Sequence, residues 1–296
     1  MRGTLLGLAV ATLAACTAPG DDSASSDEDL TAGPHVLSIG DSISFAWDPH
    51  LEKDDSKVVA SRYHGFADIV AQRLGATSDN MACPGETSAH FLHADGEDNG
   101  CAKNRATYKL HFDWGSAATQ IDAVTQYLQP RVASGRAPAL ITMTIGGNDL
   151  LRIQEDCKLP GPLAAGCELA RLPFREHSYG ENVKSIVRAI YGTGYRGKMV
   201  FITTYAPNYA DAINNIAIGR FNGELKEEVG KVQNEVPGMD LRIADGFASF
   251  KTYADQHGGK TCETGLLISN GDGTCDIHPT QQGHEVLAKT ILDAVR

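Results

Sequence analysis

The stretch ALITMTIGGND, residues 139–149, combines an apolar strand with a tight turn. Residues 139–145 are apolar or threonine, and two glycines follow at once. A short apolar run that ends at glycine is typical of a strand buried on both faces. The stretch VLSIGDS, residues 36–42, has the same form, with polar side chains directly after Gly40. Buried strands of this kind indicate a parallel sheet.

Working outward, helical patterns alternate with further strands. Strands are predicted at residues 77–82, 199–203 and 241–243. The helical spacing of apolar residues predicts helices over residues 66–74, 117–128, 182–191, 216–232 and 280–295. Repeated strand–helix units predict an α/β fold in which helices cover both faces of one parallel sheet, as a single domain.

Composition excludes several classes of protein. A chain of 296 residues, 42% hydrophobic, can bury a large core without a structural metal. The formal net charge of −11 argues against a nucleic-acid partner, which requires clustered Lys and Arg. No apolar run reaches the roughly 18 residues of a membrane-spanning helix.

The N-terminus has the form of an export signal. A basic Met1-Arg2 start and an apolar stretch over residues 5–13 lead to Leu13-Ala14-Ala15-Cys16, which resembles the lipobox of bacterial lipoproteins. An ordinary secretory signal with a chance cysteine is the alternative. The expected organisation is a signal peptide over 1–15, a flexible acidic tether over 16–34 and a globular domain over 35–296. Cys16 would then anchor an exported protein to the bacterial cell envelope, its only membrane contact.

The six cysteines after Cys16 form an even set, which in an exported protein predicts disulfides. Neighbour pairing is the simplest arrangement because each pair brackets one loop: Cys83–Cys101, Cys157–Cys167 and Cys262–Cys275. A zinc site is the competing interpretation, but the sequence has no C-x-x-C motif and the spacings fit no zinc ribbon. We therefore expect no metal.

Functional sites on parallel sheets form where strands lead into helices. Four such places carry polar or glycine-rich groups: Ser42 after Gly40-Asp41, Gly85 after Cys83-Pro84, Asn148 after the glycine pair, and His278 within Asp276-Ile277-His278-Pro279. Each signal is weak alone. Ser42 could be a helix cap, Gly85 a plain turn residue, and Asn148 part of an Asx turn.

Together, GDSIS (40–44), the Gly85 turn, GGND (146–149) and DIHPTQQGH (276–284) resemble the four sequence blocks of the SGNH (GDSL) hydrolases, in that order. The resemblance implies a three-layer α/β/α, flavodoxin-like domain and a secreted esterase or lipase without a cofactor. It makes Ser42 the nucleophile and His278 the general base. A serine hydroxyl needs a neighbouring imidazole to accept its proton.

The resemblance also implies a three-donor oxyanion hole. The donors would be the backbone N–H groups of Ser42 and Gly85 and the side chain of Asn148. Pre-positioned donors of this kind stabilise the negative charge of a tetrahedral intermediate.

One position departs from the family pattern. The aspartate common three residues before the histidine is replaced by Cys275, and Asp276 lies two residues before it. Either Asp276 reaches the imidazole or a backbone carbonyl near residues 272–276 orients it. We favour the carbonyl, and hence a Ser42–His278 dyad, with Asp276 as a tentative third member.

Other polar residues are expected to be structural. Asp41 and Asp149 would accept hydrogen bonds from nearby backbone amides, and His284 would lie on a helix surface. His90 and His93 are interpreted as solvated loop residues rather than metal ligands. Residues 95–106 resemble a calcium loop but end in alanine where a bidentate glutamate belongs.

Two long connections, residues 86–116 and 150–177, are expected as loops over the catalytic face. Their apolar residues predict either an acyl pocket or simple packing onto the core. The expected substrate is a small-molecule, lipid or glycan ester, and the expected state is a monomer. A carbohydrate O-acetyl esterase and a non-catalytic ligand-binding lipoprotein remain as alternatives.

Overall fold

The computed structural model describes residues 34–52, 62–108, 110–160 and 162–296. Residues Gly33–Arg296 form one compact unit. The predicted signal peptide, Cys16 and most of the tether lie outside the described residues. Among the described residues, no helix is both long enough and apolar enough to cross a membrane.

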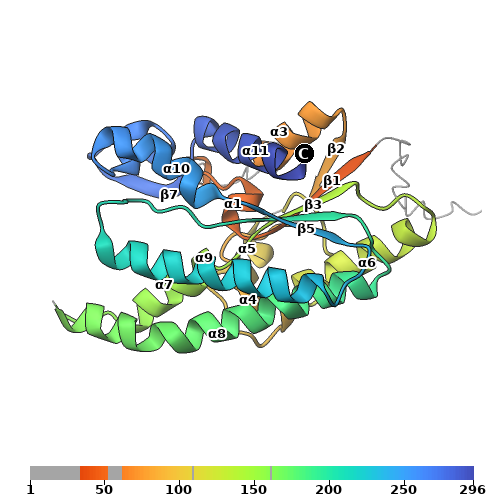
Figure 1. Ribbon diagram of the computed structural model, residues 1–296, viewed down its shortest axis with the longest axis horizontal. Helices are drawn as coiled ribbons and strands as arrows, with labels where there is room; N and C mark the ends of the chain where they lie inside the picture. The colour runs from red at the N-terminus through yellow and green to blue at the C-terminus, as the bar shows by residue number, and fades with distance from the viewer. Residues whose placement is uncertain (1–33, 53–61, 109, 161) are drawn as a thin grey trace, which may run out of the picture. The chain divides into compact units, whose positions relative to one another are not determined.

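A five-stranded parallel sheet forms the centre of the domain (Figure 1). Its strands are β1 (His35–Gly40), β2 (Thr77–Asn80), β3 (Leu140–Thr144), β4 (Lys198–Ile202) and β5 (Asp240–Ala244). Their order is β2-β1-β3-β4-β5, and every neighbouring pair is parallel. This is the flavodoxin-like order. The predicted parallel α/β fold is confirmed, and all five predicted strands are present.

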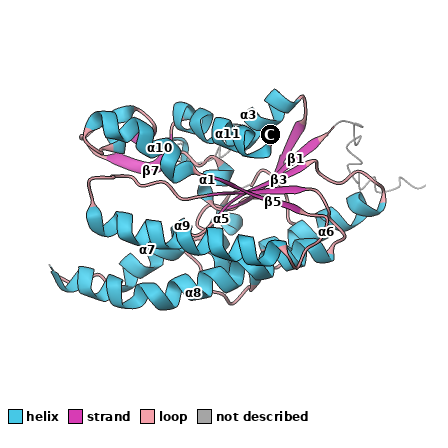
Figure 2. Cartoon of the chain, viewed as in Figure 1, coloured by secondary structure: helices cyan, strands magenta, loops and turns pink. Residues whose placement is uncertain are grey.

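Helices cover both faces of the sheet (Figure 2). One layer contains α3 (Phe66–Leu74), α10 (Gly246–Ala254) and α11 (Gln281–Val295), and the other contains α4 (Ser88–Leu92), α6 (Gln120–Ala133), α7 (Gly147–Asp156), α8 (Pro162–Gly192) and α9 (Ala212–Gln233). The shorter helices α1 (Ser42–Phe45), α2 (Pro49–Glu52) and α5 (Cys101–Thr107) belong to the connections.

Alternation along the strands produces these layers. Val36 packs with the α3, α10 and α11 side chains, whereas its neighbour Leu37 packs with those of α6, α8 and α9. Successive side chains of a strand point to opposite faces, so a continuously apolar strand supplies two cores at once.

The second long connection is helical, so the expectation of a loop over residues 150–177 is wrong. Helix α7 begins at Gly147, and α8 runs from Pro162 through Pro173 to Gly192. Pro173 lies on the exposed side of α8, as Pro130 does near the end of α6, which continues to Ala133. At exposed positions, water satisfies the carbonyl that proline leaves unpaired.

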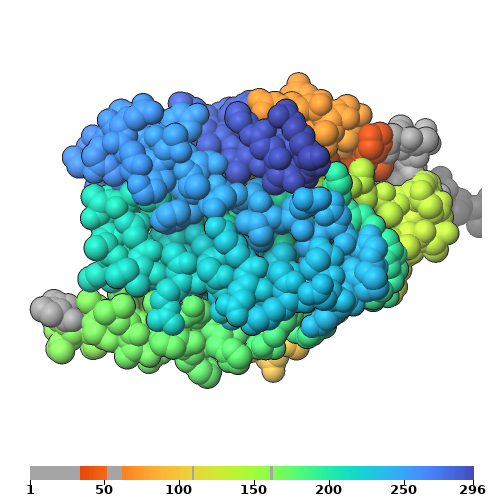
Figure 3. Space-filling model, in the orientation of Figure 1, coloured from red at the N-terminus to blue at the C-terminus, as the bar shows by residue number. Residues whose placement is uncertain are grey.

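Helices α8 and α9 lie along one another on the face drawn in Figure 3. Ion pairs join α8 to α9, from Glu176 to Arg220, and to the turn after α9, from Arg188 to Glu235. Only the inner sides of the two helices contribute to the core, and this leaves Phe174 on the outer side of α8, 73% exposed.

The first long connection, residues 86–116, holds the short helices α4 and α5. Its aromatic side chains pack inward: Phe91 is fully buried in the main core, and Trp114 is buried in a smaller cluster with Phe45 and Trp47. These residues are therefore core and not substrate pocket.

Three disulfides join the cysteines in the pairs expected from the sequence: Cys83–Cys101, Cys157–Cys167 and Cys262–Cys275. The second bond closes the corner between α7 and α8. The third joins the 3-10 helix η3 (Thr261–Thr264) to a two-stranded antiparallel hairpin of β6 (Leu267–Ser269) and β7 (Cys275–Pro279). This hairpin was not predicted, and β7 carries His278.

Candidate active site

Ser42 stands at the first residue of α1, directly after β1. The turn requires Gly40, whose φ is +116° and at which a Cβ would lie 1.9 Å from the carbonyl oxygen of Thr144. Asp41 caps α1: its carboxylate accepts hydrogen bonds from the Ile43 N–H (3.0 Å) and the Thr144 hydroxyl (2.6 Å). The chain therefore presents Ser42 at a rigid strand-to-helix turn, 8% exposed.

His278 reaches Ser42 from the other end of the sequence. The Nε2 atom of His278 lies 2.8 Å from the Ser42 hydroxyl oxygen. Its Nδ1 atom is hydrogen-bonded to the carboxylate of Asp276, which also accepts the His278 backbone N–H at 3.0 Å. With the Nδ1 proton directed at the carboxylate, the Nε2 lone pair faces the serine proton.

The position of Asp276 corrects the preference for a backbone carbonyl. Asp276 and His278 lie on strand β7, and residues i and i+2 of a strand share one face. A spacing of two therefore brings the carboxylate to the imidazole. Burial opposes ionisation of Asp276, but the hydrogen bonds and charge of His278 outweigh it and hold the pKa of Asp276 below its usual value.

Gly85 and Asn148 lie close to one another, because Asn148 is hydrogen-bonded to the residue after Gly85. The Asn148 amide donates to the Glu86 carbonyl at 2.9 Å and accepts from Asn99 at 2.8 Å, which leaves its second N–H free for a ligand. Gly85 has φ +88°, and a Cβ there would lie 2.7 Å from the Asn99 carbonyl oxygen. Ser42 and Asn148 line one cavity, and Gly85 is not among the residues that line it.

That cavity, of about 330 Å³, is mainly apolar. Its lining includes Ile43, Leu150, Leu151, Ile153, Leu169, Leu172, Ile202, Ile213, Ala217, Ile218, Ile277 and Leu287. Both interpretations of the second connection apply to Ile153 and Leu172, which line the cavity and also belong to the main core. Leu151 and Leu169 line the cavity, whereas Leu159 and Leu163 are exposed away from it.

Two histidines are placed differently from expectation. His284 is buried, not on the helix surface, because its side of α11 packs on α3, where its Nδ1 accepts the Phe66 N–H at 3.3 Å. Burial lowers the pKa of His284 to about 3. His90 is also buried and bonds Glu86 at 2.6 Å, whereas His93 is exposed at the end of α4.

The two aspartates beside the catalytic turns have the expected structural contacts. Asp41 accepts from a backbone amide, as described above, and the half-buried Asp149 accepts from the Ser88 N–H (3.0 Å) and hydroxyl (2.6 Å). Burial raises the pKa of Asp149. Sequence reasoning missed Thr144, which pairs with Gly40 in the register of β1 and β3.

The sequence matches the GDSL-like lipase/acylhydrolase family over residues 38–286. The chain belongs to this family. It is therefore a carboxylic ester hydrolase, in agreement with the resemblance of its four sequence blocks. No curated protein sequence gives a significant match.

Solved structures of esterases and lipases share the fold. An extracellular lipase from Streptomyces rimosus is 16% identical, with a TM-score of 0.51, 88% of this chain and 99% of that chain covered. A lipase from a goat rumen metagenome is 15% identical (TM-score 0.53; 88% and 96% covered), as is an acetylxylan esterase from Geobacillus stearothermophilus (TM-score 0.50; 88% and 93% covered). At these identities the likeness shows the fold alone.

Proposed function

We propose that this GDSL hydrolase is a serine esterase or lipase that forms an acyl-enzyme on Ser42. The observation that carries the proposal is the chain of contacts from Asp276 through His278 to Ser42, at the mouth of an apolar cavity. Such a chain activates a serine hydroxyl and orients its base.

In the first half of the reaction, the Ser42 oxygen attacks the ester carbonyl carbon and His278 Nε2 takes the serine proton. Hydrogen bonds from the Ser42 N–H, the Gly85 N–H and the free Asn148 N–H would stabilise the oxyanion. Collapse breaks the bond to the alcohol oxygen, which receives the proton from His278. Water then attacks the acyl-enzyme by the same route, releasing the acid and restoring Ser42.

The cavity favours an aliphatic acyl group longer than acetyl. Each methylene of the acyl chain that moves from water to this apolar lining makes binding more favourable by about 0.8 kcal/mol. A carbohydrate O-acetyl esterase is the second candidate, since an acetyl group also fits there and an acetylxylan esterase shares the fold. The acetyl group would leave most of the cavity empty.

Hydrolysis of p-nitrophenyl acetate, octanoate and palmitate, beside the Ser42→Ala variant, tests both statements. We expect turnover that disappears in Ser42→Ala, with kcat/KM higher for octanoate than for acetate. Equal turnover in the variant would contradict the Ser42 mechanism. A preference for acetate would instead favour the O-acetyl esterase.

We also propose that the protein is exported and anchored through a lipid on Cys16. The lipobox-like residues 13–16 suggest the anchor, and three disulfides suit an oxidising compartment.

A further inference from the structure

A buried carboxylate lies directly behind the oxyanion turn. Glu86 follows Gly85 and is 0% exposed. One carboxylate oxygen is 2.6 Å from His90 Nδ1, and the other accepts from the Gln120 amide at 2.9 Å. Burial raises the pKa of Glu86 to about 7, and the hydrogen bond to Glu86 raises the pKa of His90. Burying a carboxylate is costly even when it is paired, so a purely structural role would be met better by an apolar side chain.

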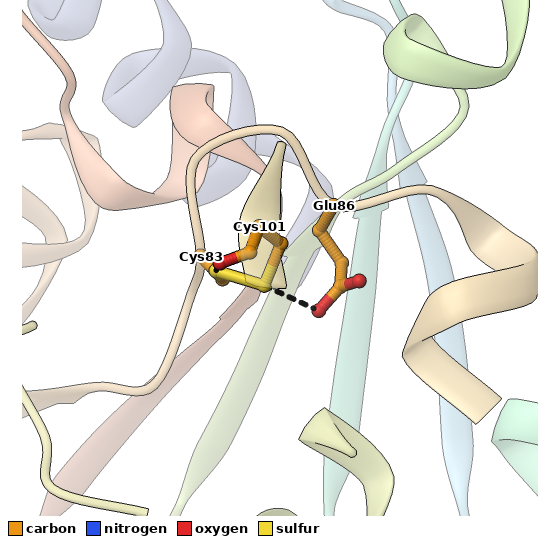
Figure 4. Close-up of side chains that lie close together, drawn as sticks. All are labelled: Cys83, Glu86 and Cys101. Atoms are coloured by element: carbon orange, nitrogen blue, oxygen red, sulfur yellow. Dashed lines mark hydrogen bonds between the residues drawn. A yellow bond between two sulfur atoms is a disulfide. The ribbon is translucent and has the colours of Figure 1, made fainter. Parts of the chain in front are cut away.

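The cluster around Glu86 does not form a metal site. The sulfurs of Cys83 and Cys101 are joined in a disulfide, which packs against the carboxylate with Cys101 Sγ 3.4 Å from Glu86 Oε2 (Figure 4). Oxidised sulfur has no hydrogen to donate and is no thiolate ligand. The nearby Asp98 carboxylate accepts two backbone N–H groups of α5, at 2.8 and 3.1 Å. The atoms that could ligate a metal ion here are therefore already bonded to other groups of the protein.

Glu86 connects instead to all three turns that carry the proposed oxyanion donors. Through its side chain it holds Gln120, whose amide also brackets Gly40: Oε1 accepts the Gly40 N–H at 2.6 Å, and Nε2 donates to the Gly40 carbonyl at 3.0 Å. Gly40 is two residues before Ser42. Through its backbone, Glu86 is bonded covalently to Gly85, and its carbonyl accepts from Asn148.

We propose that Glu86 is a positioning residue that keeps the Ser42, Gly85 and Asn148 donors in their relative places. This inference rests on the proposed Ser42 mechanism. Glu86 touches neither Ser42 nor the cavity, so it acts only through Gln120, Gly85 and Asn148. Catalytic donors must be held to about 0.5 Å, and a displacement of about 1 Å reduces the rate on the order of 100-fold.

The Glu86→Gln variant of the full chain tests the proposal. An amide has about the same size but carries no charge, and its NH₂ group can face His90 Nδ1 only if that nitrogen has given up its proton. We expect kcat for p-nitrophenyl octanoate to fall about 10- to 100-fold with KM within about 2-fold. Affinity for phenylboronic acid, which forms a tetrahedral anionic adduct with a catalytic serine, should fall by a similar factor.

Glu228→Gln is the matched control. Glu228 is another buried carboxylate, 4% exposed, which pairs with Lys184 of α8 and with Lys231 of α9. Its loss should lower the melting temperature and leave kcat and boronate affinity unchanged. If Glu86→Gln does not fold, Gln120→Met removes the bracket on Gly40 and should give the same joint loss of kcat and boronate affinity.

Three results would overturn the inference: unchanged kcat in folded Glu86→Gln, a fall in kcat without a fall in boronate affinity, or failure of both Glu86→Gln and Gln120→Met to fold. The last result would assign the network to stability alone. Ser42→Ala, run in the same assay, separates failure of the proposed function from failure of the role of Glu86. Activity that survives Ser42→Ala refutes the proposed function, whereas an unaffected Glu86→Gln in a Ser42-dependent enzyme refutes only the role of Glu86.

Discussion

At the residue scale, the unusual spacing of Asp276 and His278 decides how the base is oriented. We favoured a backbone carbonyl because Cys275 replaces the aspartate that the family commonly has three residues before the histidine. On strand β7, the spacing of two brings the Asp276 carboxylate to Nδ1. CDIHP does alternate apolar and polar side chains, but the run is five residues long and ends in proline, so we did not predict a strand there.

Asp276→Asn should therefore reduce kcat by about 10²- to 10⁴-fold, because the variant no longer holds the imidazole tautomer that accepts the serine proton. Asp272→Asn, at an exposed carboxylate in the same hairpin, should have no effect. Steady-state kinetics with p-nitrophenyl octanoate measures both. A fall in kcat of less than about 10-fold for Asp276→Asn would instead indicate that a backbone carbonyl orients His278 and that Ser42 and His278 act as a dyad.

His284 predicts how stability depends on pH. Its pKa is lowered to about 3 in the folded state, whereas an unfolded histidine titrates near 6.5. Between these values the unfolded chain binds more protons, so stability decreases as the pH falls from about 6.5 toward 3. The slope from this one residue is about 1.4 kcal/mol per pH unit at most.

Urea unfolding of the wild type and His284→Gln at pH 7 and pH 5 measures this contribution. Subtraction of the two cancels the other titrating groups, Glu86 included. We expect the wild type to lose more stability than the variant on going to pH 5, by about 1 to 2 kcal/mol. The same loss in both proteins would show that His284 is accessible to protons in the folded state.

At the element scale, continuous apolar strands were predictable and helices fixed by tertiary contacts were not. The sheet follows from stretches such as LITMTI, residues 140–145, in which every side chain is buried. Residues 150–177 lack such a signal, because Gly161, Pro162 and Pro173 interrupt the helical pattern. Their helices are held by the Cys157–Cys167 bond and by ion pairs among Glu97, Arg152, Asp156, Arg171 and Arg175.

The Cys262–Cys275 disulfide joins strand β7, which carries His278, to the 3-10 helix η3. Replacing both cysteines with serine should lower stability by about 2 to 4 kcal/mol and kcat by about 10-fold, because β7 is then held only by hydrogen bonds. The Cys157→Ser/Cys167→Ser variant should lose similar stability and keep kcat for acetate, since this bond joins the C-terminal end of α7 to α8, at the opposite end of α7 from Asn148. Thermal unfolding and p-nitrophenyl acetate turnover compare the two. Equal kcat in both variants would refute the role of the third disulfide.

At the scale of the whole molecule, the four sequence blocks predicted most of the site. Three of them follow strands of the one parallel sheet, and the fourth lies on the separate β6–β7 hairpin. The parallel order brings residues 42, 85 and 148 to one edge. The contacts of Glu86 and Gln120 could not be read from the sequence, because they join residues 34 positions apart through side chains alone.

The proposed anchor predicts where the protein is found. Expressed in a bacterium with lipoprotein processing, the chain should partition into the detergent phase of Triton X-114, and Cys16→Ala should remain in the aqueous phase. The two proteins should hydrolyse p-nitrophenyl acetate equally. Detergent partitioning of Cys16→Ala would contradict lipidation at this residue.

The proposal that Ser42 is the nucleophile is tested most directly by covalent labelling with an alkyl p-nitrophenyl phosphonate. This ester analogue transfers to serine a phosphonyl group that water does not release. We predict one phosphonyl group per chain, on Ser42, with activity lost in proportion to the fraction of chains labelled. We also predict no labelling in Ser42→Ala and slow labelling in His278→Ala. Inactivation with Ser42 unmodified, or labelling of another residue, would contradict the proposal.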